Sequence, residues 1–303
     1  MPTINKIILR SKNPNENIPG VNPGTLYVVA TPLGNRDDIT LRALKVLREV
    51  DLIAAEDTRK THRFLALHGI SNRLISCHEH NETERTPALI AKLLKGLSIA
   101  LVSNAGTPAV SDPGYRLIEG ALDNHLEIVP VPGVCAATAA LSVAGLPTDS
   151  FIFLGFLAKK KAKRIRQLSE LASQPRTLVF YESPRRILTL LNETIDVMGN
   201  RRGVLAREMT KLHEEYIRGR LSEIADQLKD RSAIKGECTL LVAGHDKNSQ
   251  PSWADVKQQI TAAVAAGQNS LSAIAREIAA TSAFAKNKIY AEALRISKKL
   301  GGG

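Results

Sequence analysis

The sequence predicts an α/β protein of two lobes with a basic helical tail. From residue 25 onward, short apolar runs alternate with amphipathic stretches, as in sheets whose strands are joined by helices. From Trp253 onward, alanine-rich helical patterns follow without a strand candidate. A chain of 303 residues is long enough for two hydrophobic cores and a small appendage. We expect five parts: a flexible N-terminal tail (1–23), two α/β lobes (24–148 and 149–244), a linker (245–252) and a helical tail (253–303).

The first lobe has the pattern of a mostly parallel sheet. Apolar runs such as TLYVVA (25–30) and SIALVS (98–103) are separated by helical patterns such as LRALKVLREV (41–50). Later helical stretches end in Gly or Asn, as helices often do. Parallel strands need crossover connections, and these stretches supply them. We expect the regular structure of this lobe to end near Gly145.

The second lobe begins at FIFLGF (151–156) and continues through a basic helical stretch, KKKAKRIRQLSELA (159–172). Two of its strand candidates, EEYIRG (214–219) and ECTLLVAG (237–244), follow one another along the chain. We take this succession to indicate a sheet of mixed strand directions. The lobe is expected to end near Gly244.

The tail follows a polar, proline-containing linker and contains three helical patterns. Ser270 is placed to cap the second helix, and the last two helices have helix-turn-helix lengths. Basic residues lie on or near the final helix: Lys286, Lys288, Arg295, Lys298 and Lys299. This pattern favours an RNA-binding unit, and the alternative is a helical cap that packs on the lobes.

The composition is that of a soluble protein with a polyanionic partner. The chain is 44% hydrophobic and 23% charged, and no apolar run approaches the roughly 18 residues of a membrane span. The N-terminus lacks the apolar region of a secretion signal, so we expect a cytoplasmic protein. The formal charge of +11 and the pI of about 9.7 favour nucleic acid over an anionic membrane surface.

The cysteines and histidines do not form a metal-binding pattern. Cys77, Cys135 and Cys238 lie far apart without a CxxC pair, so we interpret them as small buried residues. HEHNE (78–82) holds two histidines without a third ligand at a matching spacing, so no metal site is expected there. The sequence also lacks the GxSxG motif of serine hydrolases and the P-loop of nucleotide hydrolases.

Three segments rich in small residues follow strand candidates of the first lobe. They are TPLGN (31–35), SNAGTPAVSDPG (103–114) and VPGVCAATAALSVAG (131–145). In an α/β sheet, ligands bind beyond the carboxyl ends of the strands, and small residues let the backbone approach them. Plain turns and tight helix packing are the alternatives. Asp112 and Pro113 are expected to cap and begin the next helix.

Two further segments place polar side chains at strand ends. In AAEDTRKT (54–61), Glu56 or Asp57 can take a proton from a hydroxyl substrate, but Asp57 or Thr58 can also cap the next helix. In FYESPRR (180–186), the Ser-Pro pair is expected to begin a helix, which leaves the preceding Tyr and Glu as site candidates.

These five segments, in this order, resemble the tetrapyrrole methylase superfamily from about Gly24 to Gly244. Within it the chain is most similar to the branch that methylates the 2′-hydroxyl of a cytidine ribose in the decoding region of 16S ribosomal RNA. AEDTR, the basic second-lobe helix and the helical tail carry that similarity. Other members methylate porphyrin-like rings or a modified histidine of a translation factor.

The resemblance implies a two-lobed tetrapyrrole-methylase-like fold, a homodimer, and S-adenosylmethionine bound in the cleft between the lobes. By motif, the implied cofactor-binding residues are Leu33, Asn104, Gly106, Thr107, Val110, Cys135, Ala136, Tyr181 and Glu182. Asn104 departs from the family's SDAGTP motif, because an amide replaces the aspartate; it keeps hydrogen-bonding capacity but loses the charge. PGVCAA likewise replaces PGPCAA.

The implied reaction is methyl transfer to a ribose hydroxyl of 16S ribosomal RNA within the 30S subunit. A hydroxyl is a poor nucleophile, so a base is useful, and Glu56 or Asp57 is our candidate. Arg59 is expected to position the adjacent phosphate, and Glu208 is a further candidate base. The target cytidine is expected to leave its stack. Two alternatives remain: a non-catalytic ribosome-binding factor on the same fold, and a methyltransferase of tetrapyrroles or other small molecules.

Overall fold

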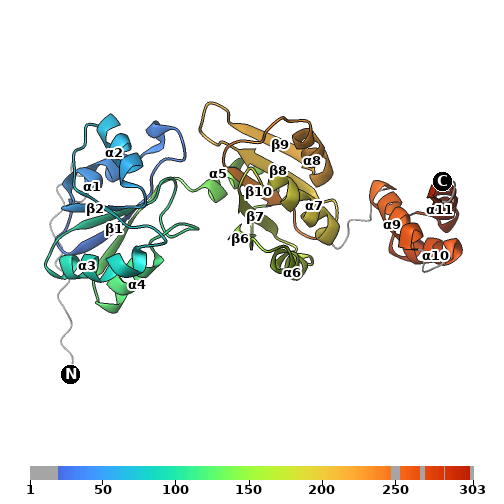
Figure 1. The fold of residues 1–303 in the computed structure, drawn as a ribbon, viewed down its shortest axis with the longest axis horizontal. Helices are drawn as coiled ribbons and strands as arrows, with labels where there is room; N and C mark the ends of the chain where they lie inside the picture. The colour runs from blue at the N-terminus through green and yellow to red at the C-terminus, as the bar shows by residue number, and fades with distance from the viewer. Residues whose placement is uncertain (1–19, 247–252, 267–269, 283, 301–303) are drawn as a thin grey trace, which may run out of the picture. The chain divides into compact units, whose positions relative to one another are not determined.

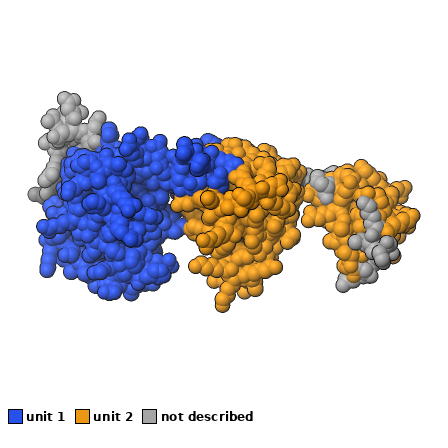
Figure 2. Space-filling view, turned by 45° about the horizontal axis from the view of Figure 1, so that its top comes forward, with its two compact units in different colours: residues 1–143, 207–215 blue, residues 144–206, 216–303 orange. Residues whose placement is uncertain are grey.

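A computed structural model describes residues 20–246, 253–266, 270–282 and 284–300 (Figure 1). Most of the expected N-terminal tail and of the linker therefore lies outside the described residues. The chain forms two compact units, distinguished by colour in Figure 2. Unit 1 comprises residues 1–143 and 207–215, and unit 2 comprises residues 144–206 and 216–303.

Unit 1 contains the expected parallel sheet. Its strands pair in the order β3-β2-β4-β1-β5, and every pair is parallel. The strands are β1 (Thr25–Val29), β2 (Leu52–Ala55), β3 (Leu74–Ser76), β4 (Ile99–Val102) and β5 (Glu127–Val131). The prediction of an α/β fold with a parallel sheet is confirmed.

Helices cover both faces of this sheet (Figure 1). Side chains alternate between the two faces along each strand. Val29 packs with the first two helices of the unit on one face. Leu26, on the same strand, points to the other face and packs with the third and fourth helices. The helices are α1 (Leu41–Glu49), α2 (Thr58–Leu67), α3 (Glu82–Leu94) and α4 (Tyr115–Asp123). A 3-10 turn, η1 (Arg36–Asp38), precedes α1, and α5 (Ala136–Ala144) follows β5.

Unit 2 contains a sheet of mixed strand directions, as the sequence predicted. Its order is β6-β7-β10-β8-β9; β7 pairs in parallel with β6 and antiparallel with β10. The strands are β6 (Phe151–Phe156), β7 (Thr177–Glu182), β8 (Arg202–Arg207), β9 (Glu215–Arg220) and β10 (Cys238–Val242). The helices α6 (Lys161–Leu171), α7 (Ile187–Met198) and α8 (Leu221–Lys229) contribute to its core.

The basic stretch before and within α6 is not uniformly available to a partner, because Arg164 is buried. Its guanidinium forms a two-point ion pair with Glu193 of α7, at 2.5 and 2.8 Å, and both side chains are less than a tenth exposed. The same guanidinium donates to the carbonyl oxygens of Ala158 and Lys159. Arg164 therefore fixes α6 to α7 and to the loop before it.

We predict that Arg164→Met destabilises unit 2 by about 3 to 5 kcal/mol, because it leaves the Glu193 carboxylate buried without its partner. The double variant Arg164→Met with Glu193→Leu should recover much of this loss, since it removes both charges. Arg166→Gln is the control, because its exposed ion pair with Glu170 is worth at most about 1 kcal/mol. Urea unfolding measures all three, and equal destabilisation by Arg164→Met and Arg166→Gln would contradict the assignment.

The C-terminal helices are α9 (Trp253–Ala266), α10 (Leu271–Thr281) and α11 (Lys286–Leu300). Their apolar side chains form a core of their own, which includes Ile260, Ile274 and Ile289. Ser270 caps α10, as predicted, by accepting a hydrogen bond from the backbone N–H of Ala273 at 3.3 Å. Across the described ranges, no helix is both long and apolar enough to span a membrane.

The basic side chains of α11 have different surroundings. The Nζ of Lys288 lies 4.4 Å from the centre of the Trp253 ring, which is a cation–π distance. Arg295 pairs with Glu292 of its own helix. Lys286 and Lys298 are exposed, and the side chain of Lys299 lies outside the described residues. The positive charge of α11 is thus partly engaged within the tail.

Candidate active site

The loops after four neighbouring strands of unit 1 meet at one edge of the sheet. β2, β4, β1 and β5 are adjacent and parallel, so their carboxyl ends lie side by side. The segments that follow them are Glu56 and Asp57 after β2, 103–114 after β4, 31–35 after β1 and 132–135 after β5. The structure therefore brings together four of the five predicted segments.

The loop after β1 is joined to the long loop after β4. Thr31 and Gly106 exchange two backbone hydrogen bonds, at 2.9 and 2.8 Å, and the Thr31 hydroxyl donates to the carbonyl oxygen of Ser103. Gly106 has a φ of +80°, and a Cβ placed there would lie 3.6 Å from the Cδ2 of Leu33. Leu33 and Gly106, both predicted to bind cofactor, are thus neighbours.

Thr107 joins the long loop to the segment that leads into α5. Its hydroxyl donates to the carbonyl oxygen of Val134 at 3.1 Å. Cys135 and Ala136 follow directly, and the carbonyl oxygen of Cys135 accepts from the first turn of α5. A Cβ at Gly133 would lie only 2.8 Å from that of Ala30, so the close approach of this segment to β1 requires glycine.

The long loop holds two non-glycine residues in the left-handed region, Ala109 at φ +66° and Ser111 at φ +63°. Such conformations persist only where the surroundings impose them, and they cluster at functional sites. Val110, between the two, is exposed at the surface of the loop. The surroundings of this loop therefore impose its backbone conformation, which its residues would not adopt by their own preference.

The predicted start of the next helix at Asp112 and Pro113 is wrong. α4 begins at Tyr115 and has Gly114 as its N-cap, without a side-chain cap of its own. The buried carboxylate of Glu82, at the start of α3, accepts from the backbone N–H groups of Gly114 and Arg116 instead. The cap comes from a residue more than thirty positions away, which a local pattern does not reveal.

Glu56 and Asn104 connect the ends of β2 and β4. The Oε2 of Glu56 accepts from the backbone N–H of Asn104 at 2.9 Å. The side-chain Oδ1 of Asn104 is buried and has no hydrogen-bond partner among the described residues. A buried acceptor without a donor is rare, and it marks a place where a ligand group can donate.

Asp57 caps α2. Its Oδ1 accepts from the backbone N–H groups of Arg59 at 2.9 Å and Lys60 at 3.3 Å, and the exposed Arg59 guanidinium lies 3.6 Å away. The hydrogen bond from Lys60, together with the bond from Arg59 and its positive charge, lowers the pKa of Asp57 below its usual range. The capping role considered in the sequence is therefore observed, and the lowered pKa makes Asp57 a weaker proton acceptor.

In unit 2, Tyr181 and Glu182 end β7. The Tyr181 ring packs edge-on against Phe153 and Phe156, with ring centres 4.9 and 5.8 Å away. Glu182 is buried, accepts from the backbone N–H of Ser183 at 2.7 Å, and pairs with Arg186 at 2.9 Å. Their part in cofactor binding stays a prediction.

The predicted helix start at Ser183 and Pro184 is wrong. α7 begins at Ile187, with Arg186 at its N-cap position. The Ser183 carbonyl accepts from the backbone of Arg186 in a turn that precedes the helix.

The sequence matches the family of tetrapyrrole (corrin/porphyrin) methylases over residues 25–225. The chain belongs to this family. A curated relative from Halalkalibacterium halodurans, named ribosomal RNA small subunit methyltransferase I, is 42% identical over 272 residues, which cover 88% of this chain and 93% of the relative. A protein of the same name from Pseudomonas aeruginosa is 51% identical over 226 residues, which cover 74% and 80% of the two chains.

The fold of this tetrapyrrole methylase is also found among solved structures. The uroporphyrin-III C-methyl transferase from Thermus thermophilus, complexed with S-adenyl homocysteine, aligns with a TM-score of 0.53 at 19% identity. The alignment covers 72% of this chain and 96% of that one. At this level of identity, the comparison supports the fold.

The residues present in the methylase fit a cofactor of the kind that the sequence implies. Gly106, at a φ of +80°, lets the long loop turn beside Leu33 without a side chain of its own. The buried Oδ1 of Asn104 offers an acceptor to an ammonium or hydroxyl group. Within the described residues, no group of three His, Cys, Asp or Glu side chains is arranged to hold a metal ion.

One contact of the methylase was not predicted. The segment 207–215, which the sequence placed in the second lobe, groups with unit 1, and the Thr210 hydroxyl accepts from the backbone N–H of Asn35 in TPLGN at 3.0 Å. Thr210 lies at φ +64°, unusual for a β-branched residue. Glu208, the further candidate base, pairs with Lys211 at 2.8 Å. No local pattern in the segment signals this contact.

Proposed function

We propose that the protein is an S-adenosylmethionine-dependent methyltransferase that acts on the ribosomal RNA of the small subunit. Its target in this proposal is the 2′-hydroxyl of a cytidine ribose in the decoding region of 16S ribosomal RNA. The proposal rests on the loops at the strand ends of unit 1, which hydrogen bonds connect to one another. The chain that forms these loops is 42% identical over most of its length to a ribosomal RNA small subunit methyltransferase I.

The loops of unit 1 would hold the cofactor. When bound, S-adenosylmethionine supplies an electrophilic methyl group on a sulfonium. Leu33, Gly106 and Thr107 would form the wall beside it, with Val110, Cys135 and Ala136 further along the same loops. The Oδ1 of Asn104 would accept a hydrogen bond from it, and Glu56 would hold the Asn104 backbone in place. Orienting reactants in this way can contribute about 7 to 11 kcal/mol to catalysis.

A carboxylate at the end of β2 would take the proton from the ribose hydroxyl. Glu56 and Asp57 are the candidates, and Glu56 is the stronger one because the cap interactions lower the pKa of Asp57. Arg59 is exposed beside them and would bind a phosphate of the RNA strand. These roles require the RNA to lie along the same edge of the sheet as the cofactor.

The substrate in this proposal is the 30S subunit, which the +11 charge of the chain favours as a polyanionic partner. We also propose that the protein acts in the cytoplasm as a homodimer.

The experiment that tests the function is to map ribose methylation of 16S ribosomal RNA in a strain from which the gene is deleted. We expect one 2′-O-methylated cytidine to be lost, and purified protein with labelled S-adenosylmethionine to restore it on 30S subunits from that strain. Unchanged methylation together with transfer to a tetrapyrrole would favour a small-molecule enzyme. Cofactor binding without transfer would favour a ribosome-binding factor.

We predict that truncation after Gly244 leaves S-adenosylmethionine affinity unchanged and weakens RNA binding, because the tail has its own core and carries a basic last helix. Each lost phosphate contact should reduce the slope of log Kd against log salt by about 0.7 to 0.9. Calorimetry measures the cofactor, and RNA binding at several salt concentrations measures the slope. An unchanged slope would indicate that the tail serves packing instead.

A further inference from the structure

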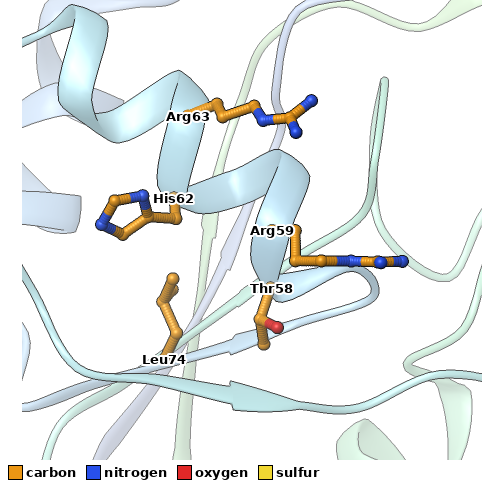
Figure 3. A pocket seen from close by; sticks show the side chains of 5 residues that line it. All are labelled: Thr58, Arg59, His62, Arg63 and Leu74. Atoms are coloured by element: carbon orange, nitrogen blue, oxygen red, sulfur yellow. The ribbon is translucent and has the colours of Figure 1, made fainter.

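The outer side of α2 carries an open hollow of about 500 Å³. It is lined by Thr58, Arg59, His62 and Arg63 of the helix and by Leu74 of β3, as Figure 3 shows. β3 is an edge strand of the sheet, so the hollow lies at the outer margin of unit 1. Because α2 begins directly after Glu56 and Asp57, the hollow is next to the candidate bases.

The hollow is strongly basic. α2 spans ten residues, TRKTHRFLAL, which include Arg59, Lys60 and Arg63 and no acidic residue. All three basic side chains are exposed. Arg59 has a distant ion pair with the capping Asp57, whereas Arg63 has no hydrogen bond or ion pair to any residue in the described ranges. Like charges one helical turn apart destabilise a helix, so an anionic ligand here would relieve repulsion.

The charge of the hollow comes from side chains and not from the helix end. The carboxylate of Asp57 already accepts from the backbone N–H groups of Arg59 and Lys60, the donors that an anion at the helix N-terminus would use. In Figure 3 the Arg59 and Arg63 guanidinium groups extend to the same side of α2. Each guanidinium can bind a phosphate through two parallel hydrogen bonds.

The remaining lining residues suit a nucleotide better than a free anion. His62 projects to the other side of α2 in Figure 3, and its imidazole offers a face on which an unstacked base can lie. Leu74 supplies an apolar surface below it. Cationic groups that follow a backbone, beside surfaces for stacking, are the features that recognise single-stranded nucleic acid.

We propose that this hollow binds the single-stranded RNA next to the target nucleotide, with Arg63 on the phosphate that follows the one held by Arg59. The inference rests on the proposed function, which makes RNA the substrate, and it adds a second backbone contact and a stacking surface to that site. The α2 surface thereby guides the strand toward the carboxyl edge of the sheet.

The test compares Arg63→Gln, Arg63→Glu and Arg63→Lys in the full chain. The first measurement is binding of a fluorescein-labelled single-stranded RNA with the decoding-region sequence at several salt concentrations. Arg63→Gln should raise Kd about three- to tenfold and reduce the salt slope by about 0.7. Arg63→Glu should raise Kd further, and Arg63→Lys should keep the slope because it keeps the charge.

The matched control is Arg48→Gln. Arg48 is also exposed, but it lies in the last turn of α1. This turn leads into the amino end of β2, whereas the candidate site lies at the carboxyl ends of the strands. This variant should leave RNA affinity and slope unchanged. For all variants, S-adenosylmethionine affinity and kcat at saturating 30S subunits should match the wild type, with KM for the subunits rising only in Arg63→Gln and Arg63→Glu.

Wild-type Kd and salt slope in both Arg63→Gln and Arg63→Glu would overturn the proposal, as would equal effects of Arg63→Gln and Arg48→Gln. The failure of this inference is distinguishable from that of the proposed function. If the wild type methylates no ribosomal RNA but its RNA affinity depends on Arg63, the function is wrong and the binding surface stands. If methylation occurs and KM is independent of Arg63, only the binding surface is wrong.

Discussion

Thr107→Arg is expected to weaken S-adenosylmethionine binding at least about a hundredfold. Thr107 lies where the long loop meets the segment before α5, and its hydroxyl donates to the carbonyl oxygen of Val134. Arginine removes this bond and places a long cation next to Gly106, where the proposed cofactor would lie. Overpacking alone costs about 1 to 3 kcal/mol, and the positive charge adds repulsion toward a sulfonium.

Isothermal titration calorimetry measures this loss, and Thr107→Ser is the matched variant because it keeps the hydroxyl and the size of the space. Thr83→Arg controls for the added charge, since Thr83 is exposed on α3. Both should bind cofactor with wild-type affinity. If Thr107→Arg also binds as the wild type does, the cofactor does not use the loop after β4, and the site must lie elsewhere in the chain.

The parts of the fold that could be predicted are those that depend on local periodicity. Apolar runs such as Ile99–Val102, followed by small-residue loops, are sufficient to indicate parallel strands with ligand-binding ends, because each signal lies within one short segment. The cap of α10 by Ser270 is local in the same way. These predictions did not require knowing which helices and strands pack against one another.

The two predictions that were wrong concern helix starts, and the basic helix also held a contact that its sequence does not reveal. Asp112 and Ser183 each precede a proline and look like helix caps, yet α4 receives its cap from Glu82 and α7 begins after a separate turn. Arg164 looks like one more cation of a basic helix until the fold places Glu193 against it. For α4 and for Arg164 the deciding partner is far away in the sequence, whereas the late start of α7 comes from a local turn.

At the candidate site, too, features within one segment could be predicted from the sequence and contacts between distant segments could not. Gly106 and Thr107 could be identified because a glycine-rich loop after a strand is a local signal. The link from Glu56 to the Asn104 backbone could not, since it joins two strands that pair only in the folded sheet. The contact of Thr210 with TPLGN is the extreme case, because it brings in a segment from 175 residues away.

Glu56→Gln is expected to lower kcat by about 10² to 10⁴ while cofactor affinity stays nearly unchanged. The amide oxygen of glutamine can still accept from the Asn104 backbone N–H, as the Glu56 carboxylate does at 2.9 Å, so the loop keeps its position. What the variant loses is the ability to accept a proton. The measurement is transfer from labelled S-adenosylmethionine to 30S subunits under single-turnover conditions.

Asp57→Asn is the matched variant at the neighbouring carboxylate. Asparagine caps helices as well as aspartate does, so α2 should remain intact. Because Asp57 already serves as the cap of α2 and its pKa is lowered there, we expect the smaller loss of kcat here. A large loss in Asp57→Asn with wild-type rates in Glu56→Gln would reverse the two roles.

Wild-type transfer by both variants would mean that neither carboxylate at the end of β2 takes the proton. The hydroxyl would then lose it to water or to Glu208, whose carboxylate pairs with Lys211 in the segment that groups with unit 1. Glu208→Gln separates these two cases, because a base lowers kcat when it is neutralised, whereas transfer to water is insensitive to it. An effect confined to Glu208→Gln would move the base from the end of β2 to the segment 207–215.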